Sequence, residues 1–155
     1  MYKGIPQFIL GQSMGGMTAY HLTLNEPELF DGAILFAPAL KNHLGGFIIS
    51  LGKLISSVLP GTLRLIRPLG GKNSQNPTIG EFIQNDQYAY SGRACLSTVA
   101  MLGRAMDESP ATFKDYKCPF IVIQGGLDKL VNPEVAFELY DNSPVANEEK
   151  ELLFY

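Results

Sequence analysis

The sequence predicts an α/β domain whose sheet is mostly parallel and is interrupted by a long helical insertion. Short apolar runs alternate with helical patterns at both ends of the chain, and residues 37–119 between the second and third runs show no strand pattern. A strand, a helix and a second strand in succession form a βαβ unit, in which both strands are parallel. Strands of a parallel sheet are buried on both faces, so each is expected to be apolar throughout.

The first βαβ unit lies in residues 5–36. Residues 5–10 (IPQFIL) predict one strand and residues 32–36 (GAILF) predict the next. The helix between them ends at Glu26, because the residue before a proline is disfavoured in a helix. Its side chains at helical spacing are Met17, Tyr20, His21 and Leu24.

The C-terminal part continues the alternation. Residues 120–124 (FIVIQ) predict a third strand, which two glycines stop. A helix follows from Pro133 to about Asp141, since proline suits the first turn of a helix. Residues 151–155 (ELLFY) predict the start of a fourth strand.

Residues 39–110 are predicted to form the insertion, and residues 1–38 and 111–155 a core that is incomplete at both ends. The insertion holds an apolar stretch at 44–65 and an amphipathic helix at 94–106. Insertions at the carboxyl edge of a parallel sheet lie over the place where ligands bind. We therefore interpret it as a lid with an apolar inner face that suits an acyl chain. A helical subdomain packed on its own core is the alternative.

Composition indicates one globular domain and excludes several partners. Of 155 residues, 46% are hydrophobic and 17% are charged, with a net charge of −3 and no basic cluster that would attract nucleic acid. Cys95 and Cys118 fit neither a zinc spacing nor a disulfide framework, which favours reduced thiols inside a cell. No signal peptide is predicted, and the most apolar stretch, 47–59, is too short to span a bilayer. The sequence therefore predicts a soluble, cytoplasmic protein.

Residues 11–15 (GQSMG) form a Gly-x-Ser-x-Gly motif between the first strand and its helix. This order is typical of a nucleophile elbow, a sharp turn in which a strained serine exposes its hydroxyl. The backbone N–H of Met14 would lie at the N-terminus of the helix, where it can donate to the oxyanion of a tetrahedral intermediate. The motif thus predicts Ser13 as a nucleophile, and a glycine-rich turn with an incidental serine is the alternative.

The glycines of the motif have a steric reason. Side chains two residues before and two residues after the serine are expected to collide with the neighbouring strand and helix, so glycine is favoured at both places. Gly11 and Gly15 occupy them, and Gly16 adds room for close packing of the helix.

A serine nucleophile requires a base, and the base requires a carboxylate, in the chain order serine, acid, histidine. The acid is expected just after the carboxyl end of a later strand. Residues 37–40 after the second strand contain no carboxylate, whereas Asp128 closes the loop after the third. Asp128 is therefore the candidate acid, and a loop aspartate that caps a helix is the alternative. Less well placed carboxylates are Asp107, Asp115 and Glu134.

The base has no candidate at the expected place. Both histidines precede Asp128 in the chain. His21 lies two turns into the helix after Ser13 and is predicted to be a packed or surface residue. His43 opens the insertion, as a substrate contact or a surface residue. We therefore expect the chain to be an internal fragment, with the base and the second oxyanion donor outside it.

Three stretches in this order resemble one family. Residues 11–16 (GQSMGG) are similar to its elbow, residues 85–93 (NDQYAYSGR) to its lid motif, and residues 119–128 (PFIVIQGGLD) to its acid strand and loop. The family is the group of α/β-hydrolases of the monoacylglycerol lipase and lysophospholipase type, often described as serine aminopeptidase-like. This chain has Gln12 where many members have histidine, and Gln87 where proline is usual.

The resemblance implies an α/β-hydrolase fold and a cofactor-free serine hydrolase that cleaves lipid esters, monoacylglycerols or lysophospholipids, through an acyl-enzyme. It implies Ser13 as nucleophile, Asp128 as acid, and Met14 and Gln12 at the oxyanion and substrate. No nucleic acid, metal or obligate protein partner is implied, and the lid is a candidate for peripheral membrane contact. The alternatives are a peptidase or general carboxylesterase of the same fold, or a non-catalytic chain without a base.

Overall fold

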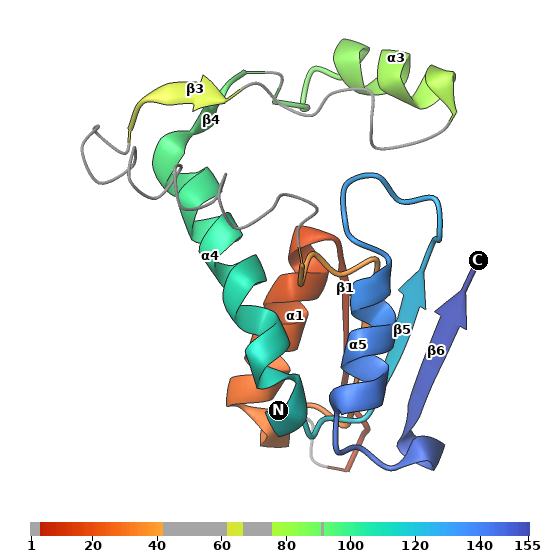
Figure 1. Ribbon diagram of the computed structural model, residues 1–155. Coiled ribbons are helices and arrows are strands. Elements are labelled where there is room, and N and C mark those ends of the chain that lie inside the picture. Colours follow the sequence, from red (N-terminus) through yellow and green to blue (C-terminus); the bar gives the residue numbers. More distant parts are fainter. Residues whose placement is uncertain (1–3, 42–61, 67–75, 91) are drawn as a thin grey trace. The chain divides into compact units, whose positions relative to one another are not determined.

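The computed structural model describes residues 4–41, 62–66, 76–90 and 92–155 (Figure 1). The chain divides into two compact units. One unit, called here the sheet unit, comprises residues 1–43 and 105–155, and the other, the insertion unit, comprises residues 44–104.

The sheet unit is built on four parallel strands in the order β1-β2-β5-β6. The strands are β1 (Phe8–Gln12), β2 (Gly32–Phe36), β5 (Phe120–Gln124) and β6 (Lys150–Phe154). Leu10 aligns with Ile34, Ile34 with Ile121, and Ile121 with Glu151. The parallel sheet predicted from the alternation of apolar runs is confirmed, and the second and third strands have the predicted bounds.

Helices connect these strands and pack on the sheet. The α1 helix (Met14–Asn25) contacts β1 and β2, and α5 (Glu134–Asn142) contacts β5 and β6. As predicted, α1 stops before Pro27, which begins the short 3-10 helix Pro27–Leu29. Two further 3-10 turns, Phe113–Asp115 and Asn147–Glu149, precede β5 and β6.

The helical side of the sheet unit holds its core. Tyr20 of α1 stacks on Tyr116, with ring centroids 4.6 Å apart, and both side chains are fully buried. Their hydroxyl groups bond Thr112 (2.9 Å) and Thr23 (2.8 Å), respectively. Burial raises the pKa of Tyr20 to about 12, so the hydroxyl stays neutral and acts as a hydrogen-bonding group.

The opposite face of the sheet carries no helix in the part of the chain that the structure describes. Ala33, Leu35 and Val122 point to the helices and are buried, whereas Leu10 is 67% exposed. The expectation that the first strand is buried on both faces is therefore wrong. β1 is an edge strand, and the side of it that carries Phe8 and Leu10 is exposed.

The insertion unit contains a small sheet as well as helices. β3 (Arg64–Ile66) pairs antiparallel with β4 (Ala94–Cys95), which corrects the expectation that this part of the chain holds no strand. The pairing joins two very short segments far apart in sequence, so no alternating pattern marks it. The hydroxyl of Tyr90 receives a hydrogen bond from Arg64 (2.7 Å) and would lie 2.3 Å from a Cβ atom on Gly92.

One helix lies within the insertion unit, and a second continues from it into the sheet unit. The α3 helix (Pro77–Asn85) is capped at its N-terminus by Asn76, whose side chain accepts the N–H of Thr78 at 3.1 Å. The α4 helix (Leu96–Thr112) starts two residues later than predicted, because β4 takes Ala94 and Cys95, and it continues six residues beyond Met106. His43 and most of the apolar stretch 44–65 lie outside the described residues. Among the described helices, none is long and apolar enough to cross a membrane.

Candidate active site

Ser13 occupies a strained turn between β1 and α1. Its backbone has φ 52° and ψ −117°, a conformation that residues other than glycine rarely adopt. Neighbouring segments hold it there: its N–H donates to the carbonyl of Phe36 (2.9 Å), and its carbonyl accepts the N–H groups of Met17 and Ala39 (3.0 Å each). This is the backbone that a nucleophile elbow requires.

The two glycines that flank Ser13 differ in their steric role. A Cβ atom on Gly11 would lie 2.2 Å from the carbonyl oxygen of Gly15, which excludes any side chain at position 11. A Cβ atom on Gly16 would lie 3.0 Å from Pro38, so Gly16 does provide close packing. The expected collision at Gly15 is wrong, because nothing lies within 4 Å of a Cβ atom there. Gly15 crowds the turn through its carbonyl group instead.

Ser13 lies at the N-terminus of α1, where negative charge is stabilised. Ser13 is exposed, and its side chain makes no capping hydrogen bond to α1. The first N–H groups of a helix have no acceptor within the helix, and the helix dipole adds partial positive charge there. The N–H of Met14, the first residue of α1, is one of these groups. Gln12, the last residue of β1, is also exposed at this edge.

Asp128 lies in a tight turn after β5. Its N–H donates to the carbonyl of Gly125 (3.3 Å), and its Oδ1 accepts the N–H groups of Leu130 (2.8 Å) and Val131 (3.0 Å). A side chain at Gly126 would meet the ring of Phe154 at 2.9 Å. The side chain of Asp128 thus shapes its own loop and leaves Oδ2 for other donors.

Ser13 and Asp128 lie at the same edge of the sheet. Each follows the carboxyl end of a parallel strand, and β2 separates β1 from β5. Strands two places apart in a sheet are about 10 Å apart, which leaves room for one base between the two side chains. The other carboxylates are elsewhere: Asp107 is on α4, Asp115 precedes β5, and Glu134 is exposed in the first turn of α5.

His21 is engaged away from Ser13. Its Nε2 lies 3.0 Å from Oγ of the buried Ser109, whose hydroxyl donates to the carbonyl of Ala105 (2.7 Å). Burial lowers the pKa of His21, while the Glu108 carboxylate opposes that change. Among the described residues, no histidine lies at Ser13.

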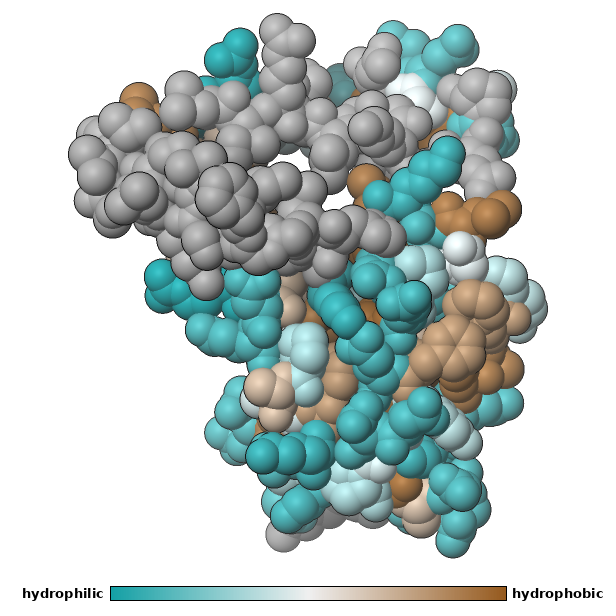
Figure 2. All heavy atoms as spheres, in the orientation of Figure 1, coloured by the Kyte–Doolittle hydropathy of each residue, from teal (hydrophilic) through white to brown (hydrophobic). Residues whose placement is uncertain are grey.

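Apolar side chains lie exposed on both sides of the candidate pair. Met14 next to Ser13 is 55% exposed, Phe36 at the end of β2 is 43% exposed, and Leu127 next to Asp128 is 73% exposed. Figure 2 shows that apolar side chains also remain on the surface of the sheet unit between hydrophilic ones. An apolar substrate group would find contacts at this edge.

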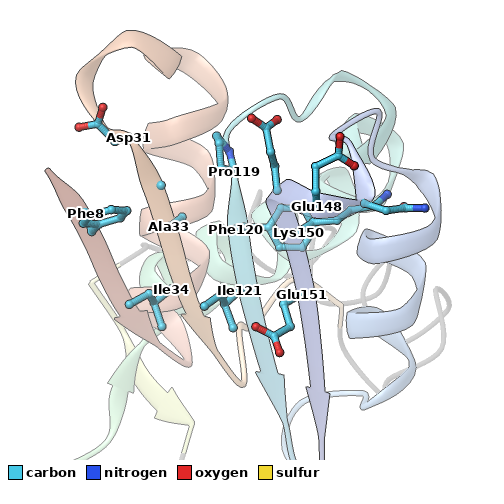
Figure 3. A pocket seen from close by; sticks show the side chains of 13 residues that line it. Phe8, Asp31, Ala33, Ile34, Pro119, Phe120, Ile121, Glu148, Lys150 and Glu151 are labelled. Carbon is cyan, nitrogen blue, oxygen red and sulfur yellow. The ribbon is translucent and has the colours of Figure 1, made fainter. Parts of the chain in front are cut away.

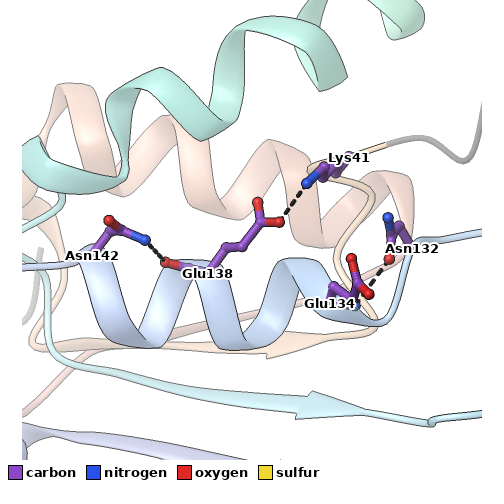
Figure 4. A network of polar contacts seen from close by, with 5 residues as sticks. All are labelled: Lys41, Asn132, Glu134, Glu138 and Asn142. Atoms are coloured by element: carbon purple, nitrogen blue, oxygen red, sulfur yellow. Dashed lines mark hydrogen bonds and ion pairs between the residues drawn. The ribbon is translucent and has the colours of Figure 1, made fainter. Parts of the chain in front are cut away.

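A polar network that the sequence did not reveal ties the loop after β2 to α5 (Figure 4). Lys41 forms an ion pair with Glu138, and its carbonyl accepts the N–H of Asn132 at 3.4 Å. The same loop supports Ser13 through Ala39. Lys41 and Glu138 are separated by 97 residues, so no local pattern could have paired them.

One hollow of the sheet unit lies away from this edge. It measures about 640 Å³ and lies on the open face at the amino ends of the strands, between Phe8, Ile34, Ile121 and Glu151 (Figure 3). Ligands of open α/β sheets bind outside the carboxyl ends of the strands. We therefore do not interpret this hollow, which lies at the amino ends, as the active site. Among the described residues, no group of three His, Cys, Asp or Glu side chains could hold a metal ion.

Comparison with known proteins decides the family. The sequence model of the family described as serine aminopeptidase, S33, matches residues 1–155. The chain belongs to this family. The α/β-hydrolase membership that the elbow, lid and acid motifs predicted is thereby confirmed.

Relatives of this S33 family chain include lipases and an esterase. Rat (Rattus norvegicus) monoglyceride lipase is 27% identical over 164 residues, which cover 99% of this chain and 51% of the lipase. Caffeoylshikimate esterase of Arabidopsis thaliana is 23% identical over 156 residues, which cover 94% of this chain and 46% of the esterase. The chain thus spans about half the length of the curated relatives it matches.

Solved structures share the fold of this S33 family chain. The monoacylglycerol lipase of Paleococcus ferrophilus matches with a TM-score of 0.82 at 24% identity, over 98% of this chain and 59% of that structure. A soluble variant of the Saccharomyces cerevisiae monoglyceride lipase, in complex with a substrate analogue, matches with a TM-score of 0.81 at 20% identity, over 99% and 53%. At these identities the likeness shows the α/β-hydrolase fold.

Proposed function

We propose that the protein is a serine hydrolase that cleaves carboxylic esters of lipids, with Ser13 as the nucleophile. The observation that carries this is the backbone of Ser13, held at φ 52° between β1 and α1 with its hydroxyl exposed. Strained backbone persists in proteins where a function needs the geometry, and the surrounding hydrogen bonds maintain it here.

In the proposed mechanism, Ser13 Oγ attacks the ester carbonyl carbon while a base removes its proton. The oxyanion that forms accepts the N–H of Met14, and one such donor contributes about 3 kcal/mol to transition-state stabilisation. The alcohol then leaves with the proton from the base, and water releases the fatty acid from the acyl-enzyme. Asp128 would orient the base and stabilise its positive charge. No cofactor takes part.

Two observations support a lipid ester as the substrate. The exposed side chains of Met14, Phe36 and Leu127 flank the candidate pair and suit an acyl chain. Relatives over nearly the whole chain bear the name monoglyceride lipase. A monoacylglycerol or lysophospholipid fits both.

The insertion unit is proposed to contact membranes. Three apolar residues of α3 are exposed and support this contact: Ile79, Phe82 and Ile83. Flotation with lipid vesicles would test it.

The base is proposed to be a histidine of the whole protein that lies outside these 155 residues. His21 is bonded to Ser109, two turns along α1 from Ser13. The relatives are about twice as long as the part that this chain matches. His43→Ala is therefore expected to retain activity, and a complete loss of activity in that variant would contradict this assignment.

A fluorophosphonate probe tests the nucleophile, because it reacts covalently with activated serines. The whole protein is expected to be labelled on Ser13, and Ser13→Ala should abolish the labelling. Asp128→Asn should slow it by a factor on the order of 10³–10⁴, as expected for a base that loses its orienting carboxylate. Asp115→Asn, which removes an exposed carboxylate elsewhere, is the matched control and should label at the wild-type rate. A folded wild type that takes up no probe would refute the proposal.

A peptidase is the second candidate, because the family is described as serine aminopeptidase. A panel of p-nitrophenyl esters of increasing acyl length and of aminoacyl p-nitroanilides separates the two. A lipid esterase prefers longer acyl chains and spares the anilides, whereas an aminopeptidase shows the reverse.

A further inference from the structure

Gln124, the last residue of β5, makes an unusual set of contacts. Its side chain is fully buried, and its Nε2 donates to the carbonyl of Gly125 (3.2 Å) and to Oδ2 of Asp128 (3.4 Å). These two acceptors fix the orientation of the amide, because a flipped side chain would place Oε1 against two oxygen atoms. Gln124 therefore presents its donor group to Asp128.

The other half of the amide is not satisfied. Oε1 of Gln124 is buried and has no hydrogen-bond partner among the described residues. A buried acceptor without a partner destabilises a fold, and an apolar side chain of similar size would avoid that loss. The stability of β5 therefore does not account for an amide at this position, whereas the hydrogen bond to Asp128 gives the amide a role in the candidate site.

We propose that Gln124 is a positioning residue for Asp128. Leu130 and Val131 bind Oδ1 of the carboxylate by their N–H groups, and the Gln124 amide binds Oδ2. Donors on both oxygens prevent the carboxylate from rotating. This role rests on the proposed function, in which the same carboxylate must meet the N–H of the base in one orientation.

The test replaces Gln124 by Met in the whole protein, which keeps the size of the side chain and removes the amide. We expect kcat for ester hydrolysis to fall roughly tenfold with KM unchanged, because the contact is longer than the usual 2.7–3.2 Å and orients Asp128 without contacting the substrate. The thermal midpoint should stay the same or rise. Gln124→Glu, which presents a carboxylate to Asp128, should lower kcat at least as much.

Ser143→Ala is the matched control. Ser143 also has a buried side-chain oxygen without a partner among the described residues, but it follows α5 and is not near Asp128 in the chain. This variant should likewise keep or raise the thermal midpoint, and kcat should not change. A kcat that falls equally in both variants would mean that Gln124 acts only through general packing, and would overturn the proposal.

Amide hydrogen exchange gives a readout that does not depend on activity. If Gln124 fixes the carboxylate, the N–H groups of Leu130 and Val131 should exchange about tenfold faster in Gln124→Met, while that of Val122 stays at the wild-type rate. Unchanged exchange at both residues together with wild-type kcat would overturn the role of Gln124. If the proposed function is wrong, the wild-type protein does not react with the fluorophosphonate. In that case hydrogen exchange at Leu130 and Val131 alone tests whether Gln124 positions Asp128.

Discussion

At the scale of single residues, backbone strain is concentrated at the carboxyl edge of the sheet. Ser13 (φ 52°) and Ala37 (φ 42°) are the two non-glycine residues with positive φ in the described part of the chain. Such conformations cost of order 1–3 kcal/mol each and persist where surrounding contacts determine them. The N–H of Ala37 bonds the carbonyl of Ile123 (2.7 Å), as that of Ser13 bonds Phe36. The strain thus coincides with the proposed site.

The glycines of the elbow give a prediction with its own control. Gly11→Ala should destabilise the protein by roughly 1–3 kcal/mol or more, because its Cβ atom would overlap the backbone of Gly15 and cannot be relieved by a rotamer change. Gly15→Ala should be neutral or stabilising by up to about 1 kcal/mol, because the position is open and alanine favours a helix. Urea unfolding monitored by circular dichroism measures both.

Equal losses in the two variants would contradict this assignment. They would mean that the turn, and not the particular contact at Gly11, requires glycine at both positions. The sequence pattern treats the two glycines alike, so only the three-dimensional contact separates them.

At the scale of elements, α1 and the C-terminal part of α4 are joined by polar groups inside an aromatic cluster. Tyr20 packs edge-on against Phe113 (5.7 Å) and bonds Thr112, while His21 bonds Ser109. Buried polar groups stabilise a packing only while their partners are kept. The contact between these helices should therefore respond to the protonation of His21.

Stability at mildly acidic pH is expected to depend on His21. Burial lowers its pKa below the ordinary value of 6.5, so the unfolded chain binds a proton more readily than the folded chain. Neutral His21 makes its full contribution to the free energy of unfolding above pH 6.5. This contribution is lost as the pH falls from 6.5 through the pKa of His21 in the folded state. The free energy of unfolding should decrease over that range. His21→Gln, which keeps a hydrogen-bonding group for Ser109, should remove this part of the decrease.

Denaturant unfolding at a series of pH values measures the difference between wild type and His21→Gln. Glu108→Gln provides a second check, because Glu108 opposes the effect of burial and its removal should extend the range to lower pH. Parallel curves for wild type and His21→Gln would contradict the assignment.

The sequence predicted elements well where local pattern determines them. Residues 32–36 and 120–124 are continuous apolar runs between turn residues, and both are strands with those bounds. β1 begins at Phe8 and not at Ile5, because pairing with β2 decides where a strand starts. The β3–β4 pair, the Lys41–Glu138 contact and the Gln124–Asp128 contact depend on geometry that no local pattern encodes. Ser13 and Asp128 could be predicted as candidate site residues because motifs mark them.

At the scale of the whole molecule, the described helices of the sheet unit cover one side of its sheet. The alternation of buried and accessible residues along β2 and β5 shows this directly: Ala33, Leu35 and Val122 are buried, and the residues between them are not. β1 and β6 each also leave one edge unpaired in the described sheet. Exposed apolar faces and free strand edges favour association between protein chains.

The 155-residue chain on its own is therefore expected to self-associate through the open face. Sedimentation velocity should show a mass that rises with concentration. Leu10→Lys places a charge on the exposed edge strand β1, where it opposes pairing and apolar contact, and should shift the chain toward monomer. Thr18→Lys adds the same charge on the exposed side of α1 and should leave the association unchanged. Equal effects of the two substitutions would mean that net charge, and not the sheet face, controls association, and a monomeric wild type would show that the face tolerates water.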